Sequence, residues 1–226
     1  MAVHRWLGIL AILVGAAWTA RGETPVGEVR LFDGKSLKGW KITEFGGQGE
    51  VHVEEGKIVL EMGSDLTGIT IESDEKLLKQ NYEITLEAMR LAGSDFFCGL
   101  TFPVDKECCS LIVGGWGGGL VGISSLDARD ASENQTGGWH EFNSNKWYKI
   151  RLWVEPKRLR AWIDDKKVVD VDTEGKQIGI RGDVQLSKPL GIATWRTMSA
   201  VRGIQIRPLS DADRKAAEKD DDADMN

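Results

Sequence analysis

The sequence predicts an all-β protein whose antiparallel sheet has one apolar face. Residues 147–164 carry the main observation: apolar and polar side chains alternate there with the period of two that is typical of a half-buried strand. The composition agrees, because 27 glycines and 9 tryptophans against 5 prolines suit a turn-rich chain of strands. A length of 226 residues, with 41% hydrophobic composition, is sufficient for one sizeable β domain.

Residues 147–164 predict one hairpin with a fixed register. The pairs expected on the apolar face are Val154 with Leu159, Leu152 with Ala161, and Ile150 with Ile163. The pairs expected on the opposite face are Glu155 with Arg158, Trp153 with Arg160, Arg151 with Trp162, and Lys149 with Asp164. Each outward pair combines opposite charges or a cation with an aromatic ring, and such pairs stabilise antiparallel sheets. A slip of one residue would reverse both faces, and Pro156 favours a four-residue loop over a tight primed turn.

The first 22 residues are predicted to be a signal peptide, so the mature protein is expected to be exported to the periplasm or the extracellular space. Residues 4–5 are polar and residues 6–14 apolar, and Ala20 and Gly22 place small residues at the −3 and −1 positions before cleavage at Glu23. An uncleaved anchor is the alternative. No membrane contact beyond this segment is expected.

The mature chain is predicted to divide into one domain and a tail. Residues 23–209 carry the strand patterns and form the domain. Residues 210–226 are charged, poor in apolar side chains and acidic, which predicts a tail that is either disordered or contains a short helical turn. The sequence does not indicate an oligomeric state.

The elements within the domain can be taken in chain order. Residues 31–40 predict a strand, a turn and a buried aromatic anchor at Trp40. Residues 82–90 alternate as a long strand. Residues 110–125 predict two short strands around a glycine-rich turn, where the glycines allow a close approach to the backbone. Residues 126–145 form a long polar loop, and loops of this length are commonly functional.

Charge and cysteine usage exclude several classes of function. The formal net charge is −6 without a basic stripe, so nucleic acid is not expected as a partner. No glycine-rich nucleotide motif occurs between a strand and a helix. Cys98 is separated from Cys108 and Cys109 by a predicted hairpin, so no structural disulfide and no cysteine nucleophile is expected. The three thiols are predicted to be buried.

The stretch Leu31-Phe-Asp-Gly-Lys-Ser-Leu-Lys-Gly-Trp40 resembles the opening motif of the 3-keto-disaccharide hydrolase domain family, formerly DUF1080. The resemblance continues through most of the mature chain. Residues 51–60 resemble the family's early hairpin, residues 82–90 its next long strand and residues 201–209 its closing strand. The resemblance implies a concanavalin A-like jelly-roll sandwich of two antiparallel sheets, as one β-sandwich over residues 23–209.

The resemblance also implies a function. The expected protein is an exported carbohydrate-active hydrolase or lyase that cleaves 3-keto-glycosides and has a carbohydrate ligand. The alternative is a non-catalytic, laminin-G-like module that binds glycans or proteins. Residues 97–99, 108–113 and 193–196 differ from the family's pattern and favour the module. A structural envelope protein is a third hypothesis.

Cleavage of a glycoside requires acids or bases on the sheet or at its rim. A displacement mechanism uses two carboxyl groups about 5–10 Å apart. In a 3-keto sugar the ketone acidifies the neighbouring C–H, so one base and one acid could drive elimination followed by hydration. The catalytic candidates are Glu87, Glu133 and His140. The alternatives are a solvent-facing sheet glutamate at Glu87 and a simply hydrogen-bonded histidine at His140.

The candidates for substrate binding lie in the polar loop and beside exposed aromatic residues. They are Trp116, Asp127, Arg129, Asp130, Asn134, Trp195 and Arg196. Carboxylates suit a hard cation, whereas arginine and asparagine suit sugar hydroxyls, so the loop predicts a sugar-binding or calcium-binding rim. A solvated polar loop is the alternative. No cofactor is expected apart from this calcium alternative, and the two histidines beyond the signal segment, His52 and His140, do not have the spacing of a zinc site.

Three tryptophans in polar or glycine-rich contexts are candidate stacking platforms for sugar rings. They are Trp116, Trp139 and Trp195, and the alternative for each is a cap on the end of the core. Trp195 with Arg196 is the pair expected first to contact a ligand.

Overall fold

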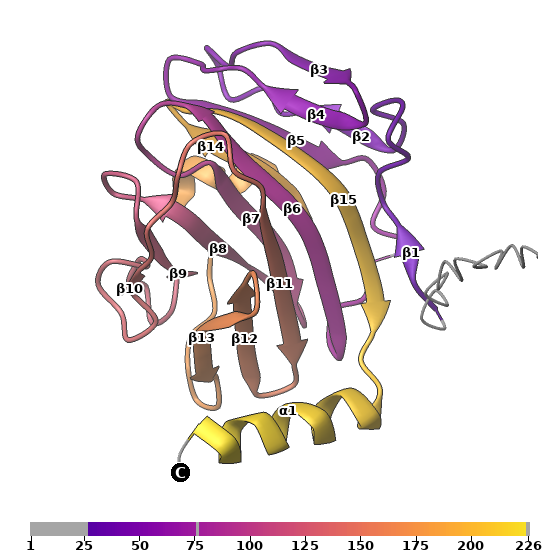
Figure 1. Ribbon diagram of the computed structural model, residues 1–226, viewed down its shortest axis with the longest axis vertical. Helices are drawn as coiled ribbons and strands as arrows, with labels where there is room; N and C mark the ends of the chain where they lie inside the picture. Colours follow the sequence, from indigo (N-terminus) through magenta and orange to yellow (C-terminus); the bar gives the residue numbers. More distant parts are fainter. Residues whose placement is uncertain (1–26, 76, 225–226) are drawn as a thin grey trace, which may run out of the picture.

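The computed structural model describes residues 27–75 and 77–224, in which strands form a sandwich of two antiparallel sheets (Figure 1). This confirms the predicted all-β jelly-roll class. The predicted signal segment, residues 1–22, lies outside the described residues. No helix in the described part of the chain has the length and apolar character needed to cross a membrane.

The eight-stranded sheet contains the predicted hairpin. Its strands in spatial order are β13 (Lys166–Asp172), β12 (Arg158–Ile163), β11 (Tyr148–Glu155), β6 (Tyr82–Ala92), β15 (Met198–Pro208), β4 (Lys57–Leu60) and β3 (Val51–Glu54), and β1 (Val29–Arg30) pairs with β15. The strands β3 and β4 form the hairpin that residues 51–60 resemble, and its turn has Glu55 and Gly56 at positive φ, as a tight two-residue turn requires.

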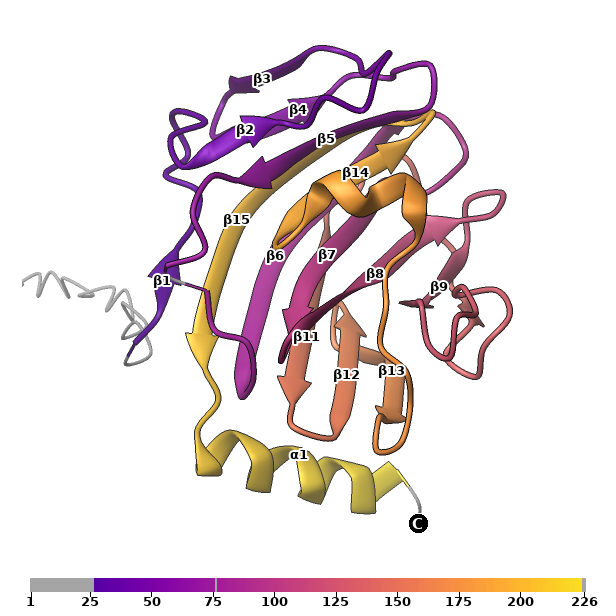
Figure 2. The ribbon, with the colours of Figure 1, turned by 180° about the vertical axis from the view of Figure 1, so that it is seen from behind.

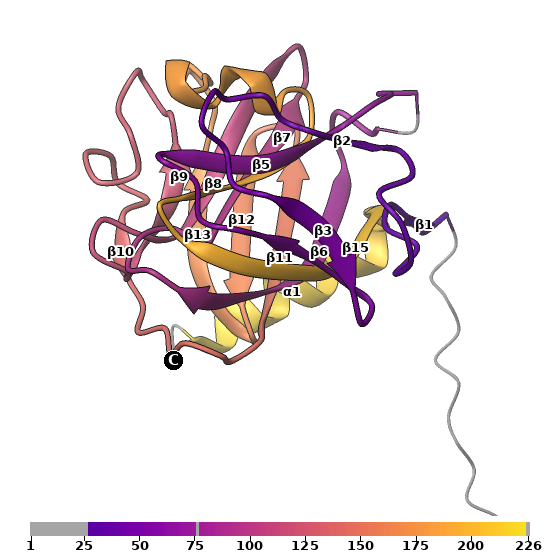
Figure 3. The ribbon, with the colours of Figure 1, turned by 90° about the horizontal axis from the view of Figure 1, so that it is seen from above.

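The seven-stranded sheet contains the glycine-rich stretch. Its strands in spatial order are β10 (Gly138–Trp139), β9 (Leu120–Ser124), β8 (Glu107–Gly115), β7 (Cys98–Val104), β14 (Gly191–Trp195), β5 (Leu66–Ile71) and β2 (Trp40–Ile42). A short 3₁₀ helix, η1 (Gly182–Ser187), crosses its outer face (Figure 2). Seen from above, η1 and the C-terminal helix α1 (Asp211–Asp224) lie on opposite sides of the sandwich (Figure 3).

The core lies between the two sheets because each strand turns alternate side chains inward. Ile84 and Leu86 of β6 and Leu100 and Phe102 of β7 are almost fully buried in it. Trp40 closes one end as predicted: it is 4% exposed, and its indole Nε1 donates to the carbonyl of Leu31 at 2.8 Å.

The hairpin of β11 and β12 has the predicted register, with Val154 opposite Leu159, Leu152 opposite Ala161 and Ile150 opposite Ile163. On the outer face the guanidinium of Arg151 lies 4.1 Å from the ring centroid of Trp162, and that of Arg160 lies 4.9 Å from the ring centroid of Trp153, as expected.

Two details of the hairpin differ from the prediction. Glu155 and Arg158 pair as strand residues, so the loop has two residues, Pro156 and Lys157, instead of four. The Glu155 carboxylate bonds the buried Arg160 at 2.8 Å, while Arg158 bonds Asp170 of β13 at 2.6 Å. The third strand, β13, therefore supplies a partner for Arg158 that cannot be predicted from the two strands of the hairpin alone.

The three cysteines are free and buried. Cys98 lies opposite Val113 at one end of the β7–β8 hairpin, whereas Cys108 and Cys109 lie opposite Pro103 and Phe102 near the turn. Burial raises the pKa of the Cys98 and Cys109 thiols to about 12, so neither thiol is a nucleophile near neutral pH.

The charged tail forms the fourteen-residue helix α1, which is longer than the predicted turn. Ser210 caps it: its Oγ accepts a hydrogen bond from the backbone N–H of Asp213 at 3.2 Å, and the Asp213 carboxylate accepts one from the Ser210 N–H at 2.8 Å. Ala217 of the helix and the preceding Leu209 pack on Trp153 and Trp162, on the outer face of the eight-stranded sheet.

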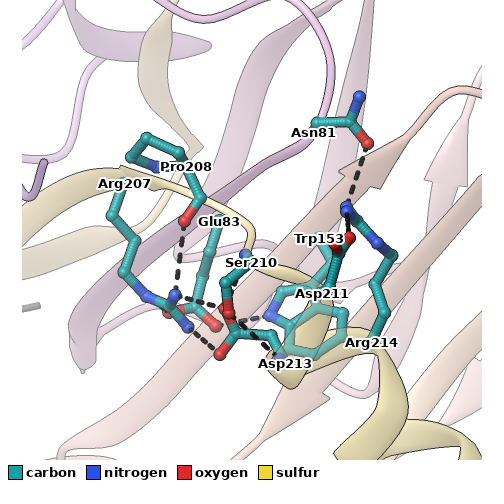
Figure 4. Close-up of polar contacts among 9 residues, drawn as sticks. All are labelled: Asn81, Glu83, Trp153, Arg207, Pro208, Ser210, Asp211, Asp213 and Arg214. Carbon is teal, nitrogen blue, oxygen red and sulfur yellow. Dashed lines mark hydrogen bonds and ion pairs between the residues drawn. The ribbon is translucent and has the colours of Figure 1, made fainter. Parts of the chain in front are cut away.

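Arg207 links this helix to the sheet (Figure 4). Its guanidinium contacts the buried carboxylate of Glu83 at 2.8 Å and the carboxylate of Asp213 at 2.9 and 3.1 Å. Glu83 also accepts a hydrogen bond from the indole N–H of Trp153. The hydrogen bond from Arg207 holds the pKa of Asp213 well below its usual range. We call Glu83, Arg207 and Asp213 the helix clamp.

Candidate functional site

A pocket of about 210 Å³ lies on the outer face of the seven-stranded sheet. Its lining residues are Asp95, Phe96, Ser110, Ile112, Trp116, Ser124, Arg181, Asp183, Val184 and Trp195. We call it the outer-face pocket. Ser110, Ile112 and Ser124 form its floor because their strand neighbours Leu111 and Ile123 point into the core.

Residues 181–187 form one wall of the pocket. Val184 packs with Phe96, Ile112 and Ala193 in an apolar cluster separate from the main core. The hydroxyl of Thr70 on β5 donates to the carbonyl of Leu186 at 3.0 Å. These contacts hold η1 against the sheet, so Arg181 and Asp183 at its start reach the pocket.

Arg181 connects both sides of the pocket. Its guanidinium contacts the carboxylate of Asp183 at 3.0 Å and that of Asp130, in the polar loop, at 2.9 Å. It also lies 5.9 Å from the ring centroid of Trp116. The hydrogen bond to Asp183, with the nearby charges of Asp183 and Asp130, raises the pKa of Arg181, so this cation is permanent.

Asp95 presents a second carboxylate to the pocket. Its Oδ1 accepts hydrogen bonds from the backbone N–H groups of Phe96 at 2.7 Å and Trp116 at 3.1 Å, which fix the orientation of the group. Within the described chain no protein donor bonds its Oδ2. A ligand can therefore interact with this oxygen without displacing a protein contact.

The floor carries two buried hydroxyl groups. Ser110 and Ser124 lie opposite each other on β8 and β9. The Oγ of Ser110 shares a hydrogen bond of 3.0 Å with Thr101, whereas the Oγ of Ser124, at 1% residue exposure, has no partner among the described residues. A buried hydroxyl without a partner is costly, and a sugar hydroxyl would satisfy it.

Arg90 supports the pocket from inside the sandwich. It is 6% exposed, and its Nη2 donates to the carbonyl of Gly118 at 2.6 Å and less closely to that of Gly114 at 3.4 Å. Gly118 lies in the turn that carries Trp116, and Gly114 lies in β8 just before this turn. Burial lowers the pKa of Arg90, and the nearby carboxylate of Asp95 opposes this effect. The buried guanidinium thus fixes the turn that places Trp116 at the mouth of the pocket.

Two predicted binding residues line this pocket, and a third contacts one of its lining residues. Trp116 and Trp195 line it, with Trp116 40% exposed. Asp130 does not line it but holds Arg181, which does. The predicted partner of Trp195 points elsewhere: Arg196 bonds Asp65 at 2.6 Å, with its guanidinium 5.5 Å from the Trp195 ring centroid.

Glu87 lies far from the pocket, on the outer face of the other sheet. Its neighbours Leu86 and Ala88 point into the core, and its carboxylate bonds Arg202 of β15 at 2.9 and 3.1 Å. The Arg202 guanidinium stacks 4.1 Å from the Trp147 ring centroid. Glu87 is therefore a paired glutamate of the eight-stranded sheet, which corresponds to the alternative stated for it.

The other two catalytic candidates also lie outside the pocket. The ring of His140 packs against Phe142, with 4.6 Å between ring centroids, and burial followed by the charge of Lys166 lowers its pKa. Glu133 is exposed in the polar loop. Neither residue lines the outer-face pocket.

The remaining loop residues stabilise the loop itself. The side-chain amide of Asn134 donates to the carbonyls of Ile123, Arg129 and Asp130 and accepts from Thr136, so it has no group left for a sugar.

Asp127 accepts a hydrogen bond from the backbone of Gln177 at 2.9 Å and lies 3.8 Å from the Lys176 ammonium. Arg129 is exposed and pairs through its backbone with Leu126. Within the described ranges no three His, Cys, Asp or Glu side chains gather in a group that could hold a metal ion.

Sequence reasoning did not identify Asp95, Arg181 and Asp183. Arg181 and Asp183 lie in an irregular segment without a periodic pattern, and Asp95 lies in a turn. One signal was available: several outward positions of the seven-stranded sheet are small, with Ser110 of β8, Ser124 of the neighbouring β9 and Gly191 of β14 among them. Small outward side chains on neighbouring strands indicate that something covers that face.

The chain was compared with known proteins. A model of the 3-keto-alpha-glucoside-1,2-lyase-like domain family matches residues 27–207. No protein of curated function matches the sequence.

Three solved structures share the fold. One is a protein of unknown function with a galectin-like fold from Bacillus subtilis, at 10% identity and a TM-score of 0.54 over 76% of this chain and 90% of that chain. Another is domain 4 of AbnA, an extracellular arabinanase from Geobacillus stearothermophilus solved with arabinotriose, at 11% identity and a TM-score of 0.52 over 83% and 94%. The Crh5 transglycosylase in complex with NAG gives 10% identity and a TM-score of 0.53 over 82% and 85%. These identities support similarity of fold only.

Proposed function

The chain belongs to the family of 3-keto-alpha-glucoside-1,2-lyase-like domains, and from this premise we propose that it is an exported enzyme that cleaves 3-keto-glycosides in the outer-face pocket. The observation that carries the proposal is the meeting of a carboxylate, Asp95, with a permanent cation, Arg181, in a pocket flanked by Trp116 and Trp195.

The charges in the pocket favour elimination over displacement. A displacement mechanism needs two available carboxyl groups. Both carboxylate oxygens of Asp183 accept hydrogen bonds from Arg181, in three contacts of 3.0–3.3 Å with its Nε and Nη2 atoms, so this carboxylate is already paired. Asp95 is then the carboxylate that a substrate can reach. One base beside one cation suits removal of a proton next to a ketone.

The proposed elimination proceeds in balanced steps. Asp95 removes the proton at C2 of the 3-keto sugar, and the C–H electron pair forms an enolate whose oxygen Arg181 stabilises. The enolate then expels the glycosidic oxygen from C1 and forms a double bond between C1 and C2, while this oxygen takes up the proton that Asp95 carries and leaves as an alcohol. Addition of water across the double bond, with the hydroxyl on C1 and the proton on C2, gives 3-ketoglucose, so elimination followed by hydration has the same products as hydrolysis.

The size and surface of the pocket suit one sugar ring. About 210 Å³ is below the range of about 300–1,000 Å³ for sites that hold drug-sized ligands. Trp116 and Trp195 offer ring faces for stacking, and the unpaired hydroxyl of Ser124 offers a hydrogen bond from the floor. We therefore expect the 3-keto unit to enter the pocket and the leaving group to remain outside it.

A glycan-binding module without catalysis is the second candidate function. The observation that favours it is the pair of tryptophans beside buried hydroxyl groups, because this combination binds sugars without any need for a base.

Turnover of 3-keto-trehalose and 3-keto-lactose by the purified mature protein tests the proposal, with release of 3-ketoglucose as the readout. The Asp95→Asn variant should lower kcat by about 10²–10⁴-fold, the usual contribution of a general base. Glu87→Gln is the matched control, since Glu87 is a paired carboxylate on the opposite sheet, and it should retain activity.

The two candidate functions give different results in this assay. Loss of turnover in Glu87→Gln with retention in Asp95→Asn would place the chemistry on the eight-stranded sheet and would contradict the proposed site. No turnover by the unmodified protein, together with glycan binding that Trp195→Ala abolishes, would replace the enzyme with the binding module.

A further inference from the structure

Trp139 is an exposed tryptophan that the outer-face pocket does not use. It belongs to β10, an edge strand of the seven-stranded sheet. It is 70% exposed, more than any other large hydrophobic residue in the described part of the chain. A ring so exposed does not serve as a cap on the core. It is available to a partner outside the described chain.

The ring packs on the protein backbone in spite of its exposure. It lies against the backbone of Gly119, where an added Cβ atom would overlap three of its carbon atoms. Trp139 pairs with Leu120 of β9, and the next backbone N–H, that of His140, donates to the Gly119 carbonyl at 2.9 Å. The ring therefore lies against Gly119 and leaves most of its surface to solvent. Tryptophan has only two side-chain torsions, so its ring loses little conformational entropy on binding.

A pocket of about 160 Å³ lies beside this ring, where the edge strands β10 and β13 of the two sheets meet. Its lining residues are Val121, Gly138, Trp139, His140, Lys166, Lys167 and Val168. Among the described residues that line it are two lysines and no carboxylate. Lys166 is exposed at the start of β13, and Lys167 contacts Asp170 at 3.0 Å. Burial, reinforced by Lys166, lowers the pKa of His140, so the positive charge near neutral pH comes from the lysines.

We propose that Trp139 and this pocket form a second binding site, which takes a negatively charged sugar unit of a polysaccharide. The ring stacks on the sugar, Lys166 and Lys167 attract its carboxylate or sulfate, and the His140 ring offers a hydrogen bond. The residues that line this pocket carry positive charge in a chain whose formal net charge is −6, while the carboxylates of Asp164 and Glu141 lie near enough to His140 to oppose the lowering of its pKa. The site is separate from the outer-face pocket and does not depend on catalysis there.

Affinity electrophoresis of the mature protein in gels that contain polygalacturonate tests this site. Carboxyl-reduced polygalacturonate is the matched neutral polymer, and heparin distinguishes a sulfate from a carboxylate ligand. We expect retardation by at least one anionic polymer and a dissociation constant at least tenfold lower than for the neutral polymer.

Two exposed-residue variants locate the binding. Trp139→Ala and Lys166→Glu should each weaken it about tenfold or more, whereas Trp116→Ala in the outer-face pocket should leave it unchanged. Turnover of 3-keto-glycosides, if present, should not change in Trp139→Ala. The proposal is overturned if no polymer retards the protein, if the neutral polymer binds equally well, or if both variants bind like the unmodified protein.

Discussion

Removal of Arg207 from the helix clamp is expected to destabilise the protein more than any other single change in the charged contacts of α1. Glu83 is 6% exposed, and among the described residues only the indole N–H of Trp153 would remain as a side-chain partner without Arg207. Breaking a buried ion pair by removing one partner costs about 3–5 kcal/mol. We therefore expect Arg207→Met to lower the free energy of unfolding by about this amount. Asp213 is more exposed, with 24% of its side chain accessible, so Asp213→Asn should cost only about 1 kcal/mol.

A double-mutant cycle in urea, followed by tryptophan fluorescence, measures this effect. Glu83→Gln removes the buried charge and keeps an oxygen for the Trp153 indole. The double variant Glu83→Gln with Arg207→Met should recover much of the stability lost in Arg207→Met alone. A coupling free energy of about 2 kcal/mol or more is expected for two groups in one buried network. A coupling near zero, or a loss below about 1 kcal/mol in Arg207→Met, would refute the reasoning.

Three further results follow from the structure. The hydrogen bond from Arg207 lowers the pKa of Asp213 in the folded state. The stability that Asp213 contributes should therefore be complete above the unfolded carboxyl pKa of about 3.9 and decrease as the pH falls below it. Urea unfolding of the unmodified protein and of Asp213→Asn at several pH values measures this difference. Arg90→Met should speed hydrogen exchange in residues 114–119, because the turn that carries Trp116 loses its buried donor; unchanged exchange would show that Arg90 does not hold this turn. The thiol of Cys109, whose pKa burial raises to about 12, should resist iodoacetamide at pH 8 until urea unfolds the chain, and modification of the folded protein at the rate of the unfolded one would contradict its burial.

The sequence allowed the sandwich to be predicted where local alternation determines which side chains face inward. The register of the β11–β12 hairpin, the turn at Glu55–Gly56 and the burial of Trp40 follow from residues close together in the chain. The contact of Arg158 with Asp170 could not be predicted in this way, because Asp170 lies on a third strand. The helix α1 was underestimated for a similar reason: its packing on Trp153 and Trp162 is a long-range contact.

The candidate site was predictable only in part. Alternation shows that Glu87 points out of the core, but a sandwich has two outward faces, and the pattern does not tell which one carries a pocket. The structure puts Glu87 on the face opposite the pocket, beside Arg202. Arg181 and Asp183 reach the pocket because an irregular segment packs across another strand through Val184, which local pattern does not reveal. Trp116 and Trp195 were identifiable from their polar or glycine-rich contexts.

The most direct test of the central claim is a crystal structure of the Asp95→Asn variant soaked with 3-keto-trehalose. The account predicts the 3-keto ring in the outer-face pocket, above Ser124 and beside Trp116, with its C2 next to the position of the Asp95 side chain. A sugar bound only on the outer face of the eight-stranded sheet, near Glu87, or an empty outer-face pocket at saturating substrate, would contradict it.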